Sequence, residues 1–459
     1  MRIHTLSPGW APGRTDDDPP PPSACIGDIP TETLVSIMRL VVSDPGPPHN
    51  AFSAALGLSQ VCGHFRLTAR STSNLWTLIY PRFPLTPNQV TFWLDILPRS
   101  EHRSIDIVIN AQAESLEVVQ LYKTFVEAVL SHSNRWRKFE ITSRTWEPID
   151  VFLRQSKHLV LFSRMEELTL YHSRDPGRAD NWEHEDPSPR FHNLLFDKDI
   201  TAPMLNIVKL GATYFDYSRA RSLVQDLSEL HLENHTYPRT SDAPGAIIKL
   251  LQASPNLEVL VLASLNLQFT TWPGCVELPH LRRLEFRGFC QSNEHLLSLL
   301  RMPALEVLFL GLCRFAVDPG PNTILPLYAA SDTMDFVYWY FVSPASTQGC
   351  WAGGLKELSL EYGQCHERQV MRLLELTTNA STFHMACSVI FDILVDNPGI
   401  LPNLRHLVVD TSIFRNTHPL YAILKNRPSV TLGIKGDLTQ EGERLYNDLK
   451  DTHDITLHV

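Results

Sequence analysis

The stretch that decides the fold is LEVLVL at residues 257–262, which recurs as LRRLEF at 281–286 and as LEVLFL at 305–310. Each copy has apolar residues at its first, fourth and sixth positions. Residues two apart in a β-strand point to the same face, so the fourth and sixth side chains share one side and the fifth lies on the other. The copies begin 24 residues apart, at 257, 281 and 305. Such a fixed period indicates stacked repeats.

The same pattern extends along most of the chain, at less regular spacing. A further clear copy is LKELSL, and the weaker copies are WRKFEI (136–141), MEELTL (165–170), LNIVKL (205–210), LSELHL (227–232) and LRHLVV (404–409). Several copies carry a proline shortly before their first apolar residue, as in SPNL and LPHL. The 24-residue spacing falls within the period of roughly 20–29 residues that is typical of leucine-rich repeats.

Helical stretches separate the copies. In NEHLLSLLRM (293–302), Leu296, Leu297 and Leu300 share one helical face. Strand and helix alternating at this period predict an α/β solenoid over residues 83–459: a curved, irregular leucine-rich-repeat-like array with a parallel sheet on its concave side. The alternative is a doubly wound α/β domain, but the glycine pattern GxGxxG of a dinucleotide-binding fold does not occur.

The fifth position of each copy is expected to face away from the core, on the concave side of the sheet. These positions are therefore our candidate substrate-binding residues: Val261, Glu285, Phe309, Ser359 and Val408. Their mixed chemistry names no particular ligand. The nearby basic residues Arg282, Arg283 and Arg287 are more typical of solvated surface arginines than of a cationic patch.

A short helical module precedes the repeats. Leu34, Ile37, Met38 and Val41 follow the spacing of one helical face, and a second helix is predicted near Val61. The module spans residues 26–82, and a chain of that length is too small to bury its apolar surface well by itself, so we expect it to meet a neighbour. Residues 1–25, rich in proline and aspartate, are predicted to form a disordered tail.

Composition and motifs exclude several classes of function. The net charge is −10, which disfavours binding to nucleic acid or to anionic membranes, and no apolar run reaches the roughly 18 residues that span a bilayer. Eight scattered cysteines and no signal peptide favour a reduced compartment, cytoplasmic and/or nuclear. Phosphate-loop, nucleophile-elbow, zinc-helix and kinase motifs are missing, so we expect no enzyme, no cofactor and no metal.

Three ordered segments of the module resemble the F-box: IPTETLVSIMRLV (29–41), LSQVCGHFRLTAR (58–70) and NLWTLI (74–79). An F-box followed by irregular leucine-rich repeats is similar to the large F-box families of mushroom-forming fungi. The sequence departs from the family pattern at Ile29, where leucine is usual, at Phe65, where tryptophan is usual, and in a longer loop after the first helix.

The resemblance implies that the module docks onto the Skp-type linker subunit of an SCF ubiquitin ligase and, through it, onto a cullin. The repeats would then bind a protein substrate. The residues implied in linker contact are Pro30, Leu34, Ile37, Val61, Cys62 and Phe65. The alternative is a leucine-rich-repeat interaction scaffold whose degenerate F-box only caps the end of the solenoid.

Overall fold

The structure is a computed structural model of the 459-residue chain. It describes residues 29–42, 48–111, 119–156, 161–172, 201–211, 224–233, 243–263, 275–287, 299–311, 354–361, 367–386, 389–410, 418–435, 443, 446–447, 449–450 and 455–458.

The fold is built on one large parallel sheet. In the described part of the chain this sheet has 14 strands, and a separate parallel pair is formed by β8 (Val276–Glu277) and β10 (Leu300–Arg301). The strands of the large sheet, in spatial order, are β1 (Leu78–Ile79), β2 (Ile105–Ala111), β3 (Trp136–Ser143), β4 (Glu167–His172), β5 (Ile207–Gly211), β6 (Glu229–Glu233), β7 (Val259–Ala263), β9 (Arg283–Arg287), β11 (Val307–Gly311), β12 (Glu357–Glu361), β13 (Thr382–Met385), β14 (His406–Asp410), β15 (Thr431–Lys435) and β16 (Ile455–His458).

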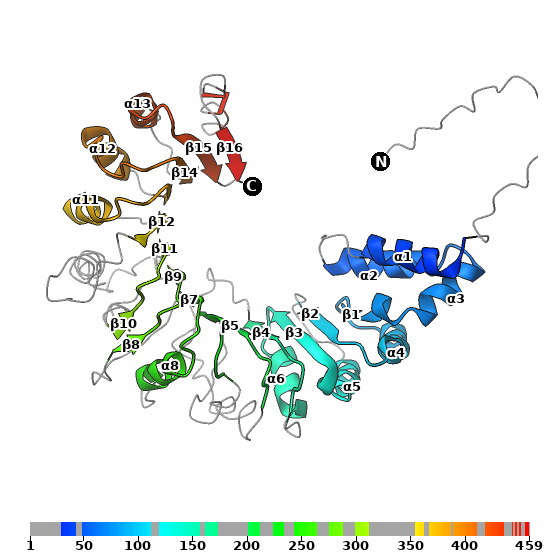
Figure 1. Ribbon diagram of the computed structural model, residues 1–459. Coiled ribbons are helices and arrows are strands. Elements are labelled where there is room, and N and C mark those ends of the chain that lie inside the picture. The colour runs from blue at the N-terminus through cyan, green and yellow to red at the C-terminus, as the bar shows by residue number, and fades with distance from the viewer. Residues whose placement is uncertain are drawn as a thin grey trace, which may run out of the picture.

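Spatial order in the sheet follows chain order, so each strand pairs with the one before it and the one after it. Figure 1 shows that the sheet curves into an arc, with strands on the inner side and helices on the outer side. The helices are α1 (Thr31–Val42), α2 (Pro48–Leu58), α3 (Gly63–Ser71), η2 (Ser73–Trp76), α4 (Pro87–Ile96), η3 (Leu97–Ser100), α5 (Val119–Leu130), η4 (Ser133–Arg135), α6 (Glu147–Gln155), α8 (Ala243–Gln252), α11 (Glu367–Leu376), α12 (Val389–Asp396) and α13 (His418–Asn426). The predicted α/β class with a parallel sheet is confirmed.

Prolines before the strands form tight turns. The backbone N–H of Leu257 donates to the carbonyl of Ser254 at 3.2 Å, and the N–H of Leu281 donates to the carbonyl of Leu278 at the same distance. The proline is the second of the four turn residues in both cases. Its fixed φ suits that position, and its missing N–H is not needed there. The proline therefore helps to set the points at which β7 and β9 begin.

Leucines of the repeated pattern form the core between sheet and helices. Leu260, Leu284, Leu308 and Leu358 are register partners on successive strands, and each is fully buried. One continuous cluster of buried apolar residues extends from Leu34 in α1 to Leu449. Because neighbouring units share this core, the helical and sheet layers of successive units support each other.

The N-terminal helices belong to the same core. Phe52 of α2 packs against Trp93 of α4 with ring centroids 4.6 Å apart. Strand β1, which lies within the predicted 26–82 module, pairs with β2 as the first strand of the sheet. The predicted boundary at residue 82 therefore runs between two paired strands.

Candidate protein-interaction surfaces

The apolar face of helix α1 is wider than the part of it that the neighbouring helices cover. Leu34 and Met38 are fully buried, whereas Ile37, Leu40 and Val41 are 40%, 75% and 45% exposed. At about 100° per residue, Leu34 and Met38 lie about 40° apart around the helix, and the three exposed residues extend over about the next 120° in one direction. Part of this face packs on α2 and α3, and the remainder is open to solvent.

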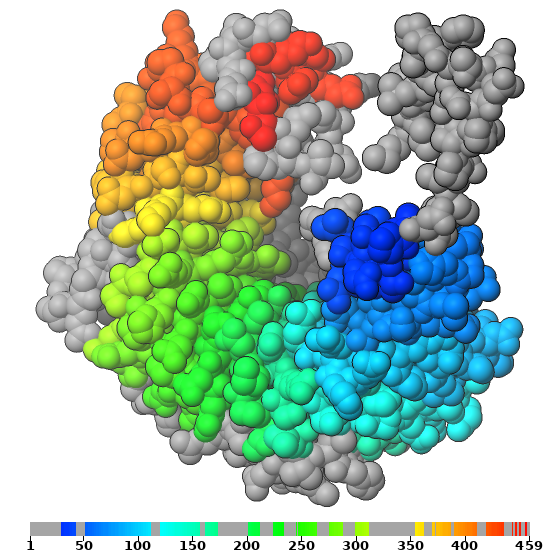
Figure 2. All heavy atoms as spheres, turned by 45° about the vertical axis from the view of Figure 1, so that its right-hand side comes forward, coloured from blue at the N-terminus to red at the C-terminus, as the bar shows by residue number. Residues whose placement is uncertain are grey.

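Helix α3 adds to this open surface. Val61, just before it, is 53% exposed and Leu67 is 69% exposed. A ring nitrogen of His64 lies 3.3 Å from the carbonyl oxygen of Ile29, which joins the start of α3 to the start of α1. We call Ile37, Leu40, Val41, Val61 and Leu67 the N-terminal apolar surface. Figure 2 shows α1 (dark blue) on the outside of the molecule.

The residues that the F-box resemblance implied in linker contact divide into two groups. Pro30, Ile37 and Val61 are exposed and Cys62 is partly exposed. The side chains of Leu34 and Phe65 are 0% and 6% exposed. These two pack inside the chain, so the structure leaves them no free surface for a partner. Sequence reasoning missed Leu40 and Leu67, because these residues do not fit the apolar spacing that locates the helices.

The inner face of the sheet contains the predicted substrate-binding row. Val261 pairs with Glu285, Glu285 with Phe309 and Phe309 with Ser359, and the row continues through His384 to Val408. However, Val261, Glu285, Ser359 and Val408 are only 2–6% exposed, and Glu285 lies between the side chains of Arg283 and Arg287. Phe309 is more open. The accessible surface therefore comes chiefly from residues two positions before or after this row, which sequence reasoning did not select.

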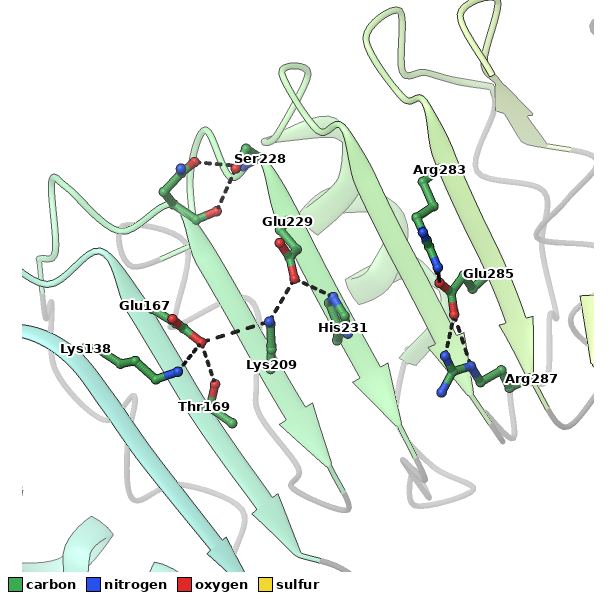
Figure 3. Close-up of polar contacts among 11 residues, drawn as sticks. Lys138, Glu167, Thr169, Lys209, Ser228, Glu229, His231, Arg283, Glu285 and Arg287 are labelled. Atoms are coloured by element: carbon green, nitrogen blue, oxygen red, sulfur yellow. Dashed lines mark hydrogen bonds and ion pairs between the residues drawn. The ribbon is translucent and has the colours of Figure 1, made fainter. Parts of the chain in front are cut away.

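A charge network crosses the inner face over β3 to β6 (Figure 3). Lys138 Nζ lies 3.1 Å from a Glu167 oxygen, Lys209 Nζ lies 2.9 Å from Glu229 Oε1, and His231 Nε2 lies 2.7 Å from the same atom. Burial would raise the pKa of Glu229, but the hydrogen bond and charge of Lys209 bring it below its usual value. Burial lowers the pKa of His231. Lys138 Nζ also lies 3.0 Å from Glu140 Oε2, so three glutamates face two lysines here.

A second cluster lies on β9 (Figure 3). Arg283 Nε donates to Glu285 Oε1 at 2.6 Å, while Nε and Nη2 of Arg287 donate to Glu285 Oε2 at 3.0 and 2.6 Å. Burial would raise the pKa of Glu285, but the hydrogen bonds and charges of the two arginines hold it below its usual value. The Arg283 and Arg287 side chains remain 48% and 51% exposed. The cluster thus carries one excess positive charge.

Two glycines allow aromatic rings to lie close to the sheet. A Cβ atom at Gly211 would come within 2.2 Å of the Tyr171 ring, and one at Gly311 within 2.7 Å of the Phe309 ring. The Arg287 guanidinium lies over the Phe309 ring at 5.4 Å from its centroid. Burial raises the pKa of Tyr171, and the carboxylate of Glu233 adds to the shift. Aromatic side chains thus flank the arginines on the inner face.

Two absences hold for the residues that the structure describes. No group of three His, Cys, Asp or Glu side chains among them is arranged to hold a metal ion. None of the helices in the described ranges has both the length and the apolar character needed to cross a bilayer. The chain matches no protein-family model and no curated protein.

Proposed function

We propose that the chain is a substrate-recognition adaptor of an SCF-type ubiquitin ligase. In this proposal residues 26–82 are an F-box-like module that binds the Skp-type linker subunit and, through it, a cullin. Residues 83–459 are an irregular leucine-rich-repeat-like solenoid that holds a protein substrate. The adaptor makes no bond itself; it acts in the cytoplasm and/or nucleus by raising the effective concentration of the target near the ligase.

One observation carries the proposal: exposed apolar side chains are concentrated at one end of the chain. Of the eight large hydrophobic residues that are exposed in the described ranges, five form the N-terminal apolar surface. Each square ångström of apolar surface removed from water contributes roughly 25 cal/mol. An apolar surface gathered on two adjacent helices is therefore typical of a protein-binding site.

The arc-shaped sheet supports the second half of the proposal. Strands in chain order, several of them preceded by a tight turn, suit a stack of similar units with a long inner face. Polar and aromatic side chains on that face, such as Arg287, Tyr171 and Phe309, are only partly covered by their neighbours. A face of this kind suits extended contact with another polypeptide.

The alternative function is a repeat scaffold whose F-box-like helices serve only as an end cap. The contact of Phe52 with Trp93 and the pairing of β1 with β2 favour it, because both attach the module to the sheet. Attachment on one side leaves the N-terminal apolar surface open, so the two roles are compatible in structure. They differ in whether a linker subunit binds.

Binding of a purified Skp-type linker subunit tests the proposal. Ile37→Asp places a charge on the N-terminal apolar surface without removing a buried side chain, so we expect the fold to persist. We expect the affinity for the linker to fall at least tenfold, about 1.4 kcal/mol, because the new carboxylate would lose its hydration in the complex. Biolayer interferometry with the full-length protein gives both dissociation constants.

Leu94→Asp is the matched control. Leu94 on α4 is 41% exposed, against 40% for Ile37, but it lies outside the N-terminal apolar surface. Its substitution should leave linker affinity within twofold of wild type. An equal loss of linker affinity in both variants would show that Ile37 does not lie at the interface with the linker. No binding of the linker by the wild-type chain would overturn the adaptor proposal and leave the end-cap scaffold.

A further inference from the structure

The arginine cluster on β9 differs from the other charges that surround it. In the network over β3 to β6, three glutamates face two lysines, and burial lowers the pKa of His231. On β9 two arginines share a single carboxylate, Glu285, whose side chain is 4% exposed. Both oxygens of the carboxylate therefore accept hydrogen bonds within the cluster. The surplus positive charge lies on the two half-exposed guanidinium groups.

The geometry of these guanidinium groups leaves donors free for another acceptor. Arginine has five N–H donors in a planar arrangement. Arg287 donates to Glu285 from Nε and Nη2, on one edge of the plane, and Arg283 contacts it from the same two atoms. Among the described contacts, the Nη1 groups of both arginines take no part. Glu285 thus fixes the orientation of two donor groups that can meet an anion in bidentate fashion.

The strands on either side of β9 are apolar on this face. Strand β7 presents Val259, Val261 and Ala263, and β11 presents Val307, Phe309 and Gly311. The next strands outward carry carboxylates on the same face: Glu229 and Glu233 on β6, where Glu229 pairs with Lys209, and Glu357 and Glu361 on β12, where Glu361 pairs with Lys435. Neighbouring strands lie about 4.8 Å apart, so these carboxylates stand roughly 10 Å from the arginines across the sheet.

We propose that the inner face binds a protein segment through one anionic side chain, a carboxylate or a phosphate, that contacts Arg283 and Arg287 and has apolar residues beside it. The apolar neighbours would rest on β7 and β11. The carboxylates of Glu233 and Glu357 beyond them disfavour a run of acidic residues and favour a single anion. The inference rests on the proposed function, since it takes the substrate to lie on the inner face.

Pools of random ten-residue peptides, captured by immobilised full-length protein, test this inference. The central residue of each pool is fixed as Glu, phosphoserine, Gln, Ser or Lys, and captured peptide is quantified by mass spectrometry. We expect capture of the Glu pool over Gln, or of the phosphoserine pool over Ser, to be about tenfold or greater, because hydrogen bonds to charged groups are the strong ones. Whichever pool dominates identifies the anion as carboxylate or phosphate.

Variants then assign the effect to the cluster. Arg283→Gln/Arg287→Gln should abolish the preference for an anion, and Arg287→Lys, which keeps the charge but loses the planar donor pair, should weaken it. Arg282→Gln is the matched control. Arg282 is also an exposed arginine, but it precedes β9 and lies outside the row on the inner face, so its loss should change nothing.

Two results would overturn the inference: equal capture of anionic and neutral pools by the wild-type protein, or a preference that persists in the double variant. The first comparison needs no substitution, so a variant that fails to fold cannot obscure it. The linker subunit is absent from this assay. Failure here therefore leaves the linker-binding result intact, and failure of linker binding leaves the peptide preference intact.

Discussion

At the scale of the residue, Glu285 shows how a buried charge can organise a surface. A carboxylate that is 3% exposed is costly unless it is paired, and here two arginines supply three hydrogen bonds. The pairing also fixes two long side chains that would otherwise sample many rotamers. A buried acid on the inner face thus determines the shape and charge of the exposed groups above it.

The lowered pKa of Glu285 predicts acid sensitivity. A carboxyl group whose folded pKa lies below its ordinary value of 4.5 stabilises the fold at pH values above 4.5. That contribution is lost as the pH falls through the lower, folded value. We expect Glu285→Gln to be less stable than wild type at pH 7 and to lose less stability between pH 5 and about pH 3, as measured by urea unfolding.

Glu277→Gln is the comparison for this experiment. The Glu277 side chain is 72% exposed and contacts Arg301 at 3.2 Å, and exposed ion pairs contribute little to stability. Its pH profile should follow that of wild type. A Glu285→Gln profile parallel to wild type across this range would contradict the role assigned to the buried carboxylate.

At the scale of the element, a tight turn recurs before the strands. Ser254 and Pro255 follow the end of α8 and begin the turn to β7, and Arg427 and Pro428 occupy the same places between α13 and β15. The turn after α11 has the same hydrogen bond, from the N–H of Ala380 to the carbonyl of Thr377 at 3.0 Å, but Thr378 replaces the proline.

This difference predicts a stabilising substitution. Thr378 is exposed and stands where proline fits in the other turns, so Thr378→Pro should raise the free energy of unfolding by about 0.4–1 kcal/mol by restricting the unfolded chain. Pro255→Ala should lower it by a similar amount. Denaturant unfolding measures both. Destabilisation by Thr378→Pro would show that the two turns differ in backbone conformation.

The elements also show what the sequence could and could not predict. The strand positions of the LxxLxL pattern were predictable because period-two alternation separates buried from open residues, and Leu260, Leu284 and Leu308 are buried as that rule requires. The covered state of Val261 and Ser359 was not predictable in this way. It depends on which side chains of neighbouring strands lie beside them, which is a property of register rather than of local sequence.

The N-terminal apolar surface illustrates the same limit. Helical spacing located the apolar arc of α1, but it could not say that α2 and α3 cover Leu34 and Met38 and leave Ile37 and Val41 open. That division depends on the angle at which three helices pack. The F-box assignment itself stays a prediction, to be decided by linker binding.

At the scale of the whole molecule, a single core runs from the first helix to the last strands. The first strand of the sheet belongs to the segment that resembles an F-box, and Phe52, Phe92 and Trp93 pack together between α2 and α4. The N-terminal helices are thus both the candidate docking surface and the cover over one end of the sheet.

Removing the N-terminal helices should lower the stability of the protein measurably. A chain of residues 83–459 would expose the unpaired edge of β2 and the aromatic side chains of α4. We expect it to unfold several degrees below the full-length protein and to self-associate with rising concentration, because open sheet edges pair with other chains. Differential scanning calorimetry and light scattering test both points.

Deletion of residues 1–25, the predicted disordered tail, provides the control for the truncation. It should leave the unfolding temperature and the association state of the full-length protein unchanged. A chain of residues 83–459 that matched the full-length protein in both measurements would show that the helical module folds independently of the sheet.

Because side chains alternate along each strand, the residues that form the core and the residues that line the inner face lie on opposite sides of the sheet. Leucines on one side hold sheet to helices, while side chains on the other side pack among themselves and line the hollow of the arc. Substitutions on the inward side can therefore accumulate while the leucines stay unchanged. A duplicated gene of this kind can change the chemistry of its inward side and keep the layer that joins its sheet to its helices.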